Sequence, residues 1–487
     1  MMKFDPRRLL RGMTAPRAAL SLMAAAMLAG CAFTPAYERP AAPVPARYAQ
    51  APEAAATTPA LDWRRYFADA TLHTLIDTAL THNRDLRVAA LNVQQVQAQL
   101  RIREADRLPT VGLAANASRS PAAGSGDLTN SFSVGLAISA WEIDFFGRLS
   151  SLRDQALAQY LATREGRDAA QSALVAAVAQ GWLALQADEE LLALTRQTLA
   201  TREESARLMR LRFQAGASSE LDWQQAVGLQ QAAQATLAQL QRQRALNENA
   251  LSLLLGQPLP QAAREALAER RLTAQSDLAT LPAGLPSDLL THRPDIRQAE
   301  QQLIAANAQI GAARAAMFPR ISLTAQAGTA SRELGDLFSG GSWGFTLAPS
   351  LLQTLFDAGR NAAQLDASRV GREIAVAQYE KAIQTAFREV SDALAGAETL
   401  RAQSDALQRQ QDAETARLRL AELRFQNGVA SSLELLDAQR SLFAVQQSRV
   451  QVRLAQLQNQ VLLYKALGGG TGQPRDDATG SQEGAGR

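Results

Sequence analysis

The chain has 487 residues and a formal net charge of +3, and it holds no basic cluster interleaved with aromatic residues. This charge is small for the length and argues against nucleic acid as a partner. Alanine, leucine, glutamine and arginine dominate the composition, which is typical of long packed helices, and the length allows two or three ordinary domains.

The first thirty residues have the pattern of a bacterial secretion signal. A basic segment precedes an apolar run at residues 18–28, which is too short for a permanent transmembrane helix. Residues 28–31 (Leu-Ala-Gly-Cys) resemble a lipobox, so residues 1–30 are predicted to be a lipoprotein signal peptide and Cys31 the acylated residue after it. Cys31 is the only cysteine and cannot form an internal disulfide; an ordinary cleavage site nearby is the alternative. Ala32, in place of an aspartate, favours delivery to the outer membrane.

Residues 31–60 are rich in proline and alanine and are predicted to form an acylated, extended tether rather than a packed element. Helical periodicity follows, because residues 72–80 place their apolar side chains on one face of a helix. A second helix is predicted from about Arg84 to Arg107, ending before Pro109.

The side-chain period then changes from 3.6 to 2. In residues 132–139 bulky side chains occupy the even positions and small or polar ones the odd positions, and residues 110–118 alternate likewise. Strands are therefore predicted at about residues 110–118 and 131–141, each apolar on one face. The polar residues 119–130 between them are predicted to be a loop.

This order of elements occurs twice. Asp85 and Asp295 are 210 residues apart, and the stretches Arg212-Phe213-Gln214-Ala215-Gly216 and Arg424-Phe425-Gln426-Asn427-Gly428 are 212 residues apart. The predicted segments are a first repeat at 61–257, a linker or equatorial segment at 258–285, a second repeat at 286–468 with strands at about 320–328 and 342–351, and a disordered tail at 469–487.

Each repeat ends in a proline-free hairpin of two long helices, predicted at about residues 148–255 and 360–467. In the second hairpin, apolar residues recur at steps of four and three, which is heptad spacing. The pattern breaks at Gly428, where glycine can take the left-handed conformation that ends a helix. At about 1.5 Å per residue, the first arm would be on the order of 100 Å long.

These elements predict an α+β membrane protein built from two tandem structural repeats. No stretch beyond the signal is apolar enough for a transmembrane helix, so a membrane-spanning part would have to be a β-barrel. Four strands cannot close a barrel alone, because the smallest usual barrel has about eight, and copies of the chain are therefore expected to assemble. A long α-helical coiled-coil barrel would continue this transmembrane β-barrel into the periplasm. A soluble coiled coil is the alternative, but it leaves the alternating segments unexplained.

Five stretches in the second half of the chain form a distinctive set: Gly284-Leu285-Pro286-Ser287-Asp288-Leu289-Leu290, His292-Arg293-Pro294-Asp295-Ile296-Arg297, Phe318-Pro319-Arg320-Ile321-Ser322-Leu323, Arg424-Phe425-Gln426-Asn427-Gly428 and Leu435-Leu436-Asp437-Ala438-Gln439-Arg440. They resemble signatures of the TolC-like outer-membrane efflux channels, in the lipoprotein branch that serves resistance-nodulation-division drug pumps. The resemblance covers about residues 31–470, and His292 departs from a branch that often has arginine there.

The resemblance implies a homotrimer with a 12-stranded barrel in outer-membrane lipid. It also implies two protein partners, a periplasmic adaptor that the helical tips contact and an inner-membrane resistance-nodulation-division pump. The channel itself would be a passive exit duct, closed at rest at its periplasmic end and opened when the adaptor engages.

The two helical turns are the predicted adaptor-docking tips. The residues are Arg212, Phe213, Gly216, Ser218, Ser219 and Leu221 in the first turn, and Arg424, Phe425, Gly428, Ser431, Ser432 and Leu433 in the second. Glycine and serine are also favoured as helix caps, so simple capping is the alternative.

Leu433, Asp437 and Arg440 are spaced by four and three and so lie on one helical face. By resemblance, Leu433 and Asp437 of three subunits would form an apolar and an acidic ring that narrow the closed pore, with Arg440 as an ion-pair partner. A ring of carboxylates would favour cations, and each would raise the pKa of its neighbours. An ordinary exposed charge pair is the alternative.

The sequence carries no recognisable catalytic pattern. His73, His82 and His292 are not in a metal-binding spacing, and no nucleophile elbow or phosphate loop is present. We therefore predict no catalytic or metal-binding residues, no cofactor and no enzymatic activity. Export of small amphipathic compounds is the predicted function; a type I protein secretion conduit and a metal-ion efflux channel are the alternatives. The lipobox and the Gly-Leu-Pro-Ser-Asp-Leu-Leu stretch favour the first.

Overall fold

The computed structural model describes residues 33–48, 62–121, 128–269, 271–274, 277–279, 281 and 289–470. The predicted signal peptide, Cys31 and residues 471–487 of the predicted tail lie outside these ranges. No helix in the described ranges is both long and apolar enough to cross a membrane.

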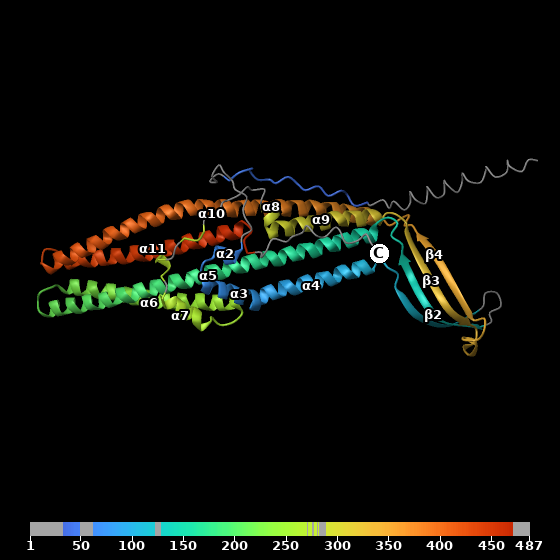
Figure 1. The fold of residues 1–487 in the computed structure, drawn as a ribbon, viewed down its shortest axis with the longest axis horizontal. Coiled ribbons are helices and arrows are strands. Elements are labelled where there is room, and N and C mark those ends of the chain that lie inside the picture. Colours follow the sequence, from blue (N-terminus) through green and yellow to red (C-terminus); the bar gives the residue numbers. More distant parts are fainter. Residues whose placement is uncertain are drawn as a thin grey trace, which may run out of the picture. The chain divides into compact units, whose positions relative to one another are not determined.

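Helices and strands follow one another along the chain in two similar series (Figure 1). The elements are α2 (Trp63–Tyr66), α3 (Ala70–His82), α4 (Arg84–Ala105), β1 (Val111–Pro121), β2 (Leu128–Glu142), α5 (Arg148–Gln214), α6 (Glu220–Leu255), α7 (Gln261–Glu269), η2 (Leu272–Ala274), α8 (Leu289–His292), α9 (Pro294–Ala315), β3 (Arg320–Ser331), η4 (Leu334–Asp336), β4 (Trp343–Leu352), α10 (Arg360–Gln426) and α11 (Ser432–Ala466).

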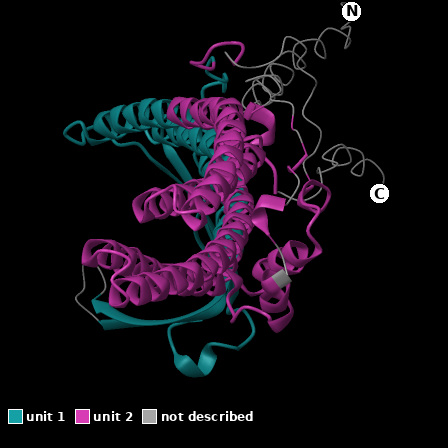
Figure 2. Ribbon diagram, turned by 90° about the vertical axis from the view of Figure 1, so that its left-hand side faces the viewer, with its two compact units in different colours: residues 1–41, 92–164, 298–379 teal, residues 42–91, 165–297, 380–487 magenta. Residues whose placement is uncertain are grey.

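The chain divides into two compact units, and each unit draws on both predicted repeats (Figure 2). Unit 1 comprises residues 1–41, 92–164 and 298–379, and unit 2 comprises residues 42–91, 165–297 and 380–487. The elements therefore repeat along the sequence, but each compact unit contains elements from both repeats. The long helices α5 and α10 each begin in unit 1 and end in unit 2.

Unit 1 contains a four-stranded antiparallel sheet in the order β1-β2-β3-β4. Within the described residues, β1 and β4 have no further strand beside them and form its two edges. Strand β1 pairs with β2 as far as Pro121 opposite Leu128. The predicted loop at 119–130 is therefore wrong at both ends, because polar side chains near a strand end do not interrupt backbone pairing.

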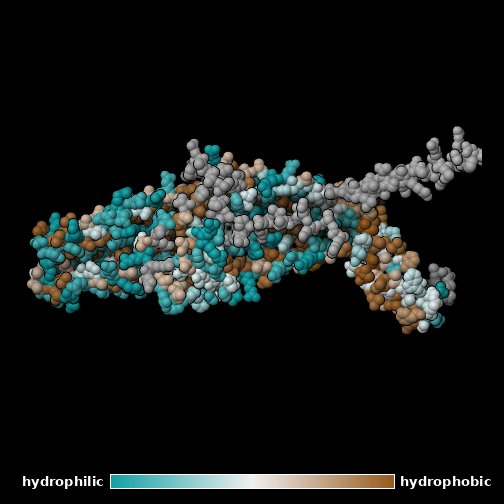
Figure 3. All heavy atoms as spheres, viewed as in Figure 1, coloured by the Kyte–Doolittle hydropathy of each residue, from teal (hydrophilic) through white to brown (hydrophobic). Residues whose placement is uncertain are grey.

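One face of this sheet is apolar across all four strands. The register places Leu113 opposite Leu136, Leu136 opposite Ala327, and Ala327 opposite Phe345, so these side chains share a face. The other face carries small and polar residues such as Asn116. Phe345 is 72% exposed, and Figure 3 shows hydrophobic residues gathered over the strands. An exposed apolar face of this extent is typical of a membrane or protein contact surface.

Residues 33–39, here called the strap, are held against helices α5 and α9 of unit 1. Asn307 donates its amide to the carbonyl of Pro35 at 2.7 Å, and Arg314 donates to the carbonyl of Phe33 at 3.2 Å. The ring of Phe33 stacks on Phe318 with centroids 4.5 Å apart. The prediction of an unpacked tether is therefore wrong for the strap, because proline-rich chain can also dock in extended form when its carbonyls find donors.

The buried carboxylate of Glu300 binds the last residues of the strap. The guanidinium of Arg39 binds Glu300 through two hydrogen bonds of 2.7 and 2.9 Å, and the hydroxyl of Tyr37 donates to the same carboxylate at 2.9 Å. The side chain of Glu300 is only 8% exposed. Burial and the bond to Glu300 raise the pKa of Tyr37, so its hydroxyl stays a donor at neutral pH.

Unit 2 is organised around a hydrophobic core that contains the fully buried Trp182 of α5. The indole nitrogen of Trp182 donates to Asp69 at 2.9 Å, and Asp69 in turn caps α3 through the amide of Thr71. The heptad residues of α11 that belong to this core are Val450, Leu457, Val461 and Tyr464. Their burial confirms the heptad interpretation of the returning helix.

The two repeats end in matching close contacts within unit 2. Gly256, with φ +69°, lies against the carbonyl of His82, and Gly468, with φ +90°, lies against the carbonyl of His292. A side chain at either glycine would be strained by the left-handed backbone and would also meet that carbonyl. Both histidines thus occupy structural positions at helix ends.

We expect Arg39→Ala to loosen the strap, because it leaves the buried carboxylate of Glu300 with Tyr37 as its remaining described hydrogen-bond partner. Losing charge-assisted hydrogen bonds to a buried group costs about 1–3 kcal/mol, so amides of the strap and of its α9 contacts should exchange hydrogen about tenfold to a hundredfold faster. Hydrogen–deuterium exchange measured by mass spectrometry checks this.

Arg369→Ala is the matched control in the same unit. Arg369 pairs with Asp366, but the side chains are 53% and 70% exposed, so the pair contributes less than about 1 kcal/mol. Equal exchange rates in the two variants would contradict the role assigned to Glu300.

Candidate functional site

The turn between α5 and α6 and the turn between α10 and α11 have the same construction. The amides of Gly216 and Ala217 donate to the carbonyls of Phe213 and Arg212 at 2.9 and 2.7 Å. In the second turn, Gly428 and Val429 donate to Phe425 and Arg424 at 3.1 and 2.9 Å. Both glycines have φ +73°. This is the Schellman pattern, which satisfies the last carbonyls of a helix and requires a residue in the left-handed region.

Serines begin the returning helices. Ser219 accepts from the amide of Asp222 at 3.2 Å, and Asp222 accepts from the amide of Ser219 at the same distance, which is a capping box. Ser431 accepts from the amide of Glu434 at 3.4 Å. These bonds show that both serines cap helices, which was the alternative interpretation. Capping uses the side of each turn that faces its helix, so the outer side can still contact a partner.

The two turns are also joined to each other within unit 2. The hydroxyl of Ser432 bonds the carboxylate of Asp222, and the guanidinium of Arg212 lies 5.0 Å from the centre of the Phe425 ring. The bond to Ser432 is the main cause that lowers the pKa of Asp222, so this carboxylate is ionised at neutral pH. Sequence analysis missed Asp222, although its place three residues after Ser219 was a usable capping-box signal.

Beneath the turns, a small apolar cluster packs the four helices together. Its members are Ala206, Met209, Ala226 and Leu436, with Trp223, Val227, Leu229 and Phe425 packed against them. Phe213 stacks on Trp223 with centroids 5.7 Å apart. Phe213 and Phe425 therefore contribute to the packing that stabilises the turns.

The predicted docking residues accordingly divide into two groups. Those that are exposed and available to a partner are Arg212, Gly216, Ser219, Leu221, Arg424, Gly428, Ser431 and Leu433. Ser218, Phe213 and Phe425 are half-buried, and Ser432 is buried at 8% exposure. Ser432 thus connects the two turns rather than offering a free surface.

The predicted gate residues share one exposed side of α11. Leu433 is 58% exposed. The carboxylate of Asp437 forms an ion pair with Arg440, as the spacing predicted, and a second one with Arg417 of α10 at 2.5 Å. Arg417 also donates to Glu414 at 3.2 Å, so a network of four charges connects α10 and α11 here.

Sequence analysis missed Arg417, and the reason is geometric. In an antiparallel hairpin, residues at similar distances on either side of the turn face each other, and Arg417 and Asp437 flank Gly428 in that way. The hydrogen bond from Arg417 is the largest cause that lowers the pKa of Asp437. A carboxylate ring would act in the opposite direction, so within one chain the arginines keep Asp437 ionised.

Among the described residues, no group of three or more histidine, cysteine, aspartate or glutamate side chains could hold a metal ion. The ring nitrogens of His73 and His82 lie 2.6 and 3.1 Å from the carbonyls of Phe67 and Thr78, so both side chains have local structural partners.

Two known proteins similar to this chain are named as outer membrane proteins. At 46% identity over 473 residues, the chain is similar to "Probable efflux pump outer membrane protein TtgC" of Pseudomonas putida, covering 93% of this chain and 96% of that protein. At 44% identity over 458 residues it is similar to "Outer membrane protein OprJ" of Pseudomonas aeruginosa, with 92% and 95% covered.

Solved structures with a similar fold are also membrane proteins. A membrane protein from Pseudomonas aeruginosa superposes with a TM-score of 0.84 at 43% identity, covering 91% of this chain and 99% of that one. The open state of the Neisseria gonorrhoeae MtrE outer membrane channel superposes with a TM-score of 0.82 at 38% identity, covering 91% and 99%. The sequence profile of the family described as "Outer membrane efflux protein" matches residues 75–257 and 285–469. The chain therefore belongs to the outer membrane efflux protein family.

Proposed function

We propose that the chain is the outer-membrane exit channel of a tripartite efflux system for small amphipathic compounds. The observation that carries the proposal is the sheet of unit 1 in a member of this family. The sheet combines one continuous apolar face with two edges that no further strand pairs within the described residues. Relatives are named as toluene and antibiotic efflux pump outer membrane proteins, which favours small organic cargo over polypeptides or metal ions.

We propose assembly as a homotrimer, which the family resemblance implies and the edges of the sheet, open within the described residues, support. Unpaired backbone groups at β1 and β4 would be costly in lipid, where no water can satisfy them. Three copies would supply 12 strands and close the transmembrane β-barrel, with the apolar face turned to lipid. The paired helices of the three chains would then continue as the α-helical barrel in the periplasm.

The gate of the closed duct would lie at α11. Three copies of Leu433 would narrow the pore with an apolar ring, and three Asp437 carboxylates would form the acidic ring next to it. In this proposal Arg417 and Arg440 hold each Asp437 in place, since both pair with it within the chain. Opening would require these ion pairs to rearrange, which an adaptor could drive by pulling on the turns.

The exposed residues of the two turns would be the adaptor-docking surface. Leu221 and Val429 are 67% and 69% exposed beside the rigid Schellman turns, and exposed apolar side chains on a rigid support suit a protein interface. An inner-membrane resistance-nodulation-division pump would feed the adaptor. The duct itself would have no cofactor, no energy source and no catalytic role.

Acylation of Cys31 would add a lipid anchor in the outer membrane. Cys31 lies outside the described residues, but Phe33 is fixed by its stacking on Phe318 and by the bond from Arg314. An acyl chain two residues before such a fixed point would be restrained relative to unit 1. In this proposal the anchor would assist the barrel rather than replace it.

The gate can be tested in planar lipid bilayers. The double variant Leu433→Ala with Asp437→Ala should raise single-channel conductance several-fold, because it removes both constricting rings. Arg417→Ala should raise it as well, since Asp437 then loses its partner on α10.

Asp366→Ala is the control, because that carboxylate is 70% exposed and pairs only with its own helix neighbour among the described residues. Conductance that is the same in all four proteins would refute the gate.

Docking can be tested in cells that depend on this channel for efflux. Leu221→Glu places a charge on the exposed turn and should abolish most dye export, because burying an unpaired carboxylate in an interface is costly. Native mass spectrometry should still show the trimer mass, and bilayer conductance should be unchanged.

Leu334→Glu in η4 is the matched control, since Leu334 has the same 67% exposure as Leu221 and lies in the β3–β4 connection. Normal export by the Leu221→Glu variant would exclude this turn as the docking surface.

A further inference from the structure

Among the described residues of unit 2, the buried Arg202 has no carboxylate partner. Arg202 of α5 is 4% exposed. One of its terminal nitrogens donates to the carbonyl of Leu229 on α6 at 2.9 Å, and the guanidinium lies 5.0 Å from the centre of the Phe443 ring on α11. A carbonyl dipole and an aromatic face attract a cation, but neither carries a negative charge.

A second buried arginine of the same unit, Arg293, and the half-buried Arg244 are both neutralised. Arg293 is 5% exposed and pairs with Asp295 and Glu389 at 2.6 and 2.8 Å. Arg244 pairs with Glu189 and Glu248 at 2.5 and 2.7 Å. Within the described residues Arg202 has no such ion pair, and burial alone lowers its pKa. Fully buried arginines are almost always paired, so the position of Arg202 calls for a counter-ion.

A cavity of about 170 Å³, partly open at the surface of the chain, lies at this arginine. Its wall comes from α5, α10 and α11, and includes Thr198, Arg202, Leu418, Gln439, Phe443 and Gln446. The Nε atom of Arg202 and the side-chain oxygen of Gln439 are buried and have no hydrogen-bond partner among the described residues. At about 30 Å³ per water molecule, the space suits a few waters or one small anion.

We propose that this cavity binds one small monovalent anion, chloride or a short carboxylate. Such an anion would accept a hydrogen bond from the free Nε of Arg202 and neutralise its charge in a low-dielectric site. The amide of Gln439 can serve as a second donor when its oxygen and nitrogen positions are exchanged, a choice that the hydrogen-bond network decides. Water alone would satisfy Nε and leave the charge uncompensated.

The site has a consequence for gating that rests on the proposed function. The cavity lies where α5 faces α10 and α11, and its lining residue Gln439 lies between the gate residues Asp437 and Arg440 of α11. Separation of the two helix pairs would open one wall and expose Arg202 to water. The bound anion would therefore stabilise the closed duct, because it binds only when the helices are together.

Crystals of the full channel soaked in sodium bromide test the site directly. We expect an anomalous bromide peak within hydrogen-bond distance of the Arg202 Nε. Water density there without an anomalous signal would overturn the proposal, and this experiment needs no mutation.

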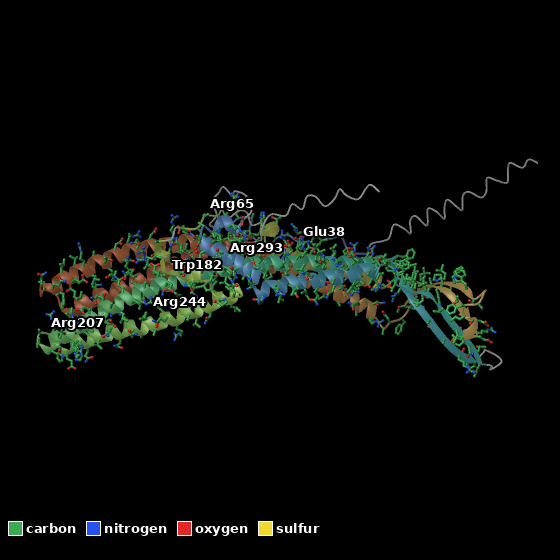
Figure 4. The ribbon with its side chains drawn as sticks, turned by 60° about the horizontal axis from the view of Figure 1, so that its bottom comes forward. Glu38, Arg65, Trp182, Arg207, Arg244 and Arg293 are labelled. Carbon is green, nitrogen blue, oxygen red and sulfur yellow. The ribbon has the colours of Figure 1, made fainter. Side chains whose placement is uncertain are left out.

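Thermal unfolding of the detergent-solubilised protein gives a second readout. Replacing gluconate by chloride at constant ionic strength, from about 10 to about 500 mM, should raise the unfolding temperature of the wild type through mass action. Arg202→Met fills the same space without a charge and should lose this chloride response. Arg207→Met is the control, because Arg207, labelled with Arg244 and Arg293 in Figure 4, is 58% exposed and paired with Glu204. A chloride response retained in Arg202→Met would refute the site.

The coupling to gating has its own test. In planar bilayers the wild type should open less often in chloride than in gluconate, and Arg202→Met should show no difference. Bound bromide with chloride-independent opening would overturn the coupling while leaving the site. A wild type that forms no channel at all would instead count against the proposed function.

Discussion

The constraint on which the rest depends is that every backbone group at the edge of a strand needs a hydrogen-bond partner. The sheet of this chain pairs its four strands with one another and leaves the outer sides of β1 and β4 open within the described residues. Its apolar face is typical of a membrane or protein contact surface. In the proposed function, closure by further copies meets both conditions, and the long paired helices of each repeat would then surround a common axis.

Much of the fold could be predicted from the sequence because its elements repeat simple periods. The alternation around residues 132–139 lies within β2, and the heptads of α11 lead to the buried Val450 and Leu457. Gly428 ends α10 in the left-handed conformation that its position suggested. Such features depend on local spacing, which a sequence displays directly.

The features that were missed depend on contacts distant in sequence or on backbone pairing. The strap is proline-rich and looked unstructured, yet Glu300 and Asn307, more than 260 residues away, hold it. Arg417 reaches Asp437 across the hairpin, and Asp222 reaches Ser432 from the other repeat. Arg202 carries no signal at all in the sequence, since only the packing of α5 against α6 and α11 removes it from water. Periodicity predicts which face is buried, but not which charges meet there.

The strap also sets an order of events during biogenesis. Its partners Glu300, Asn307 and Arg314 lie in the second half of the chain, whereas Ser151, which bonds Thr34, lies in the first half. The strap therefore cannot dock completely until more than three hundred residues have been synthesised. Until then the buried carboxylate that binds Arg39 is missing, and among the contacts of the described residues the strap has only the one with α5. Complete docking is thus a step that joins the two repeats and must follow synthesis of α9.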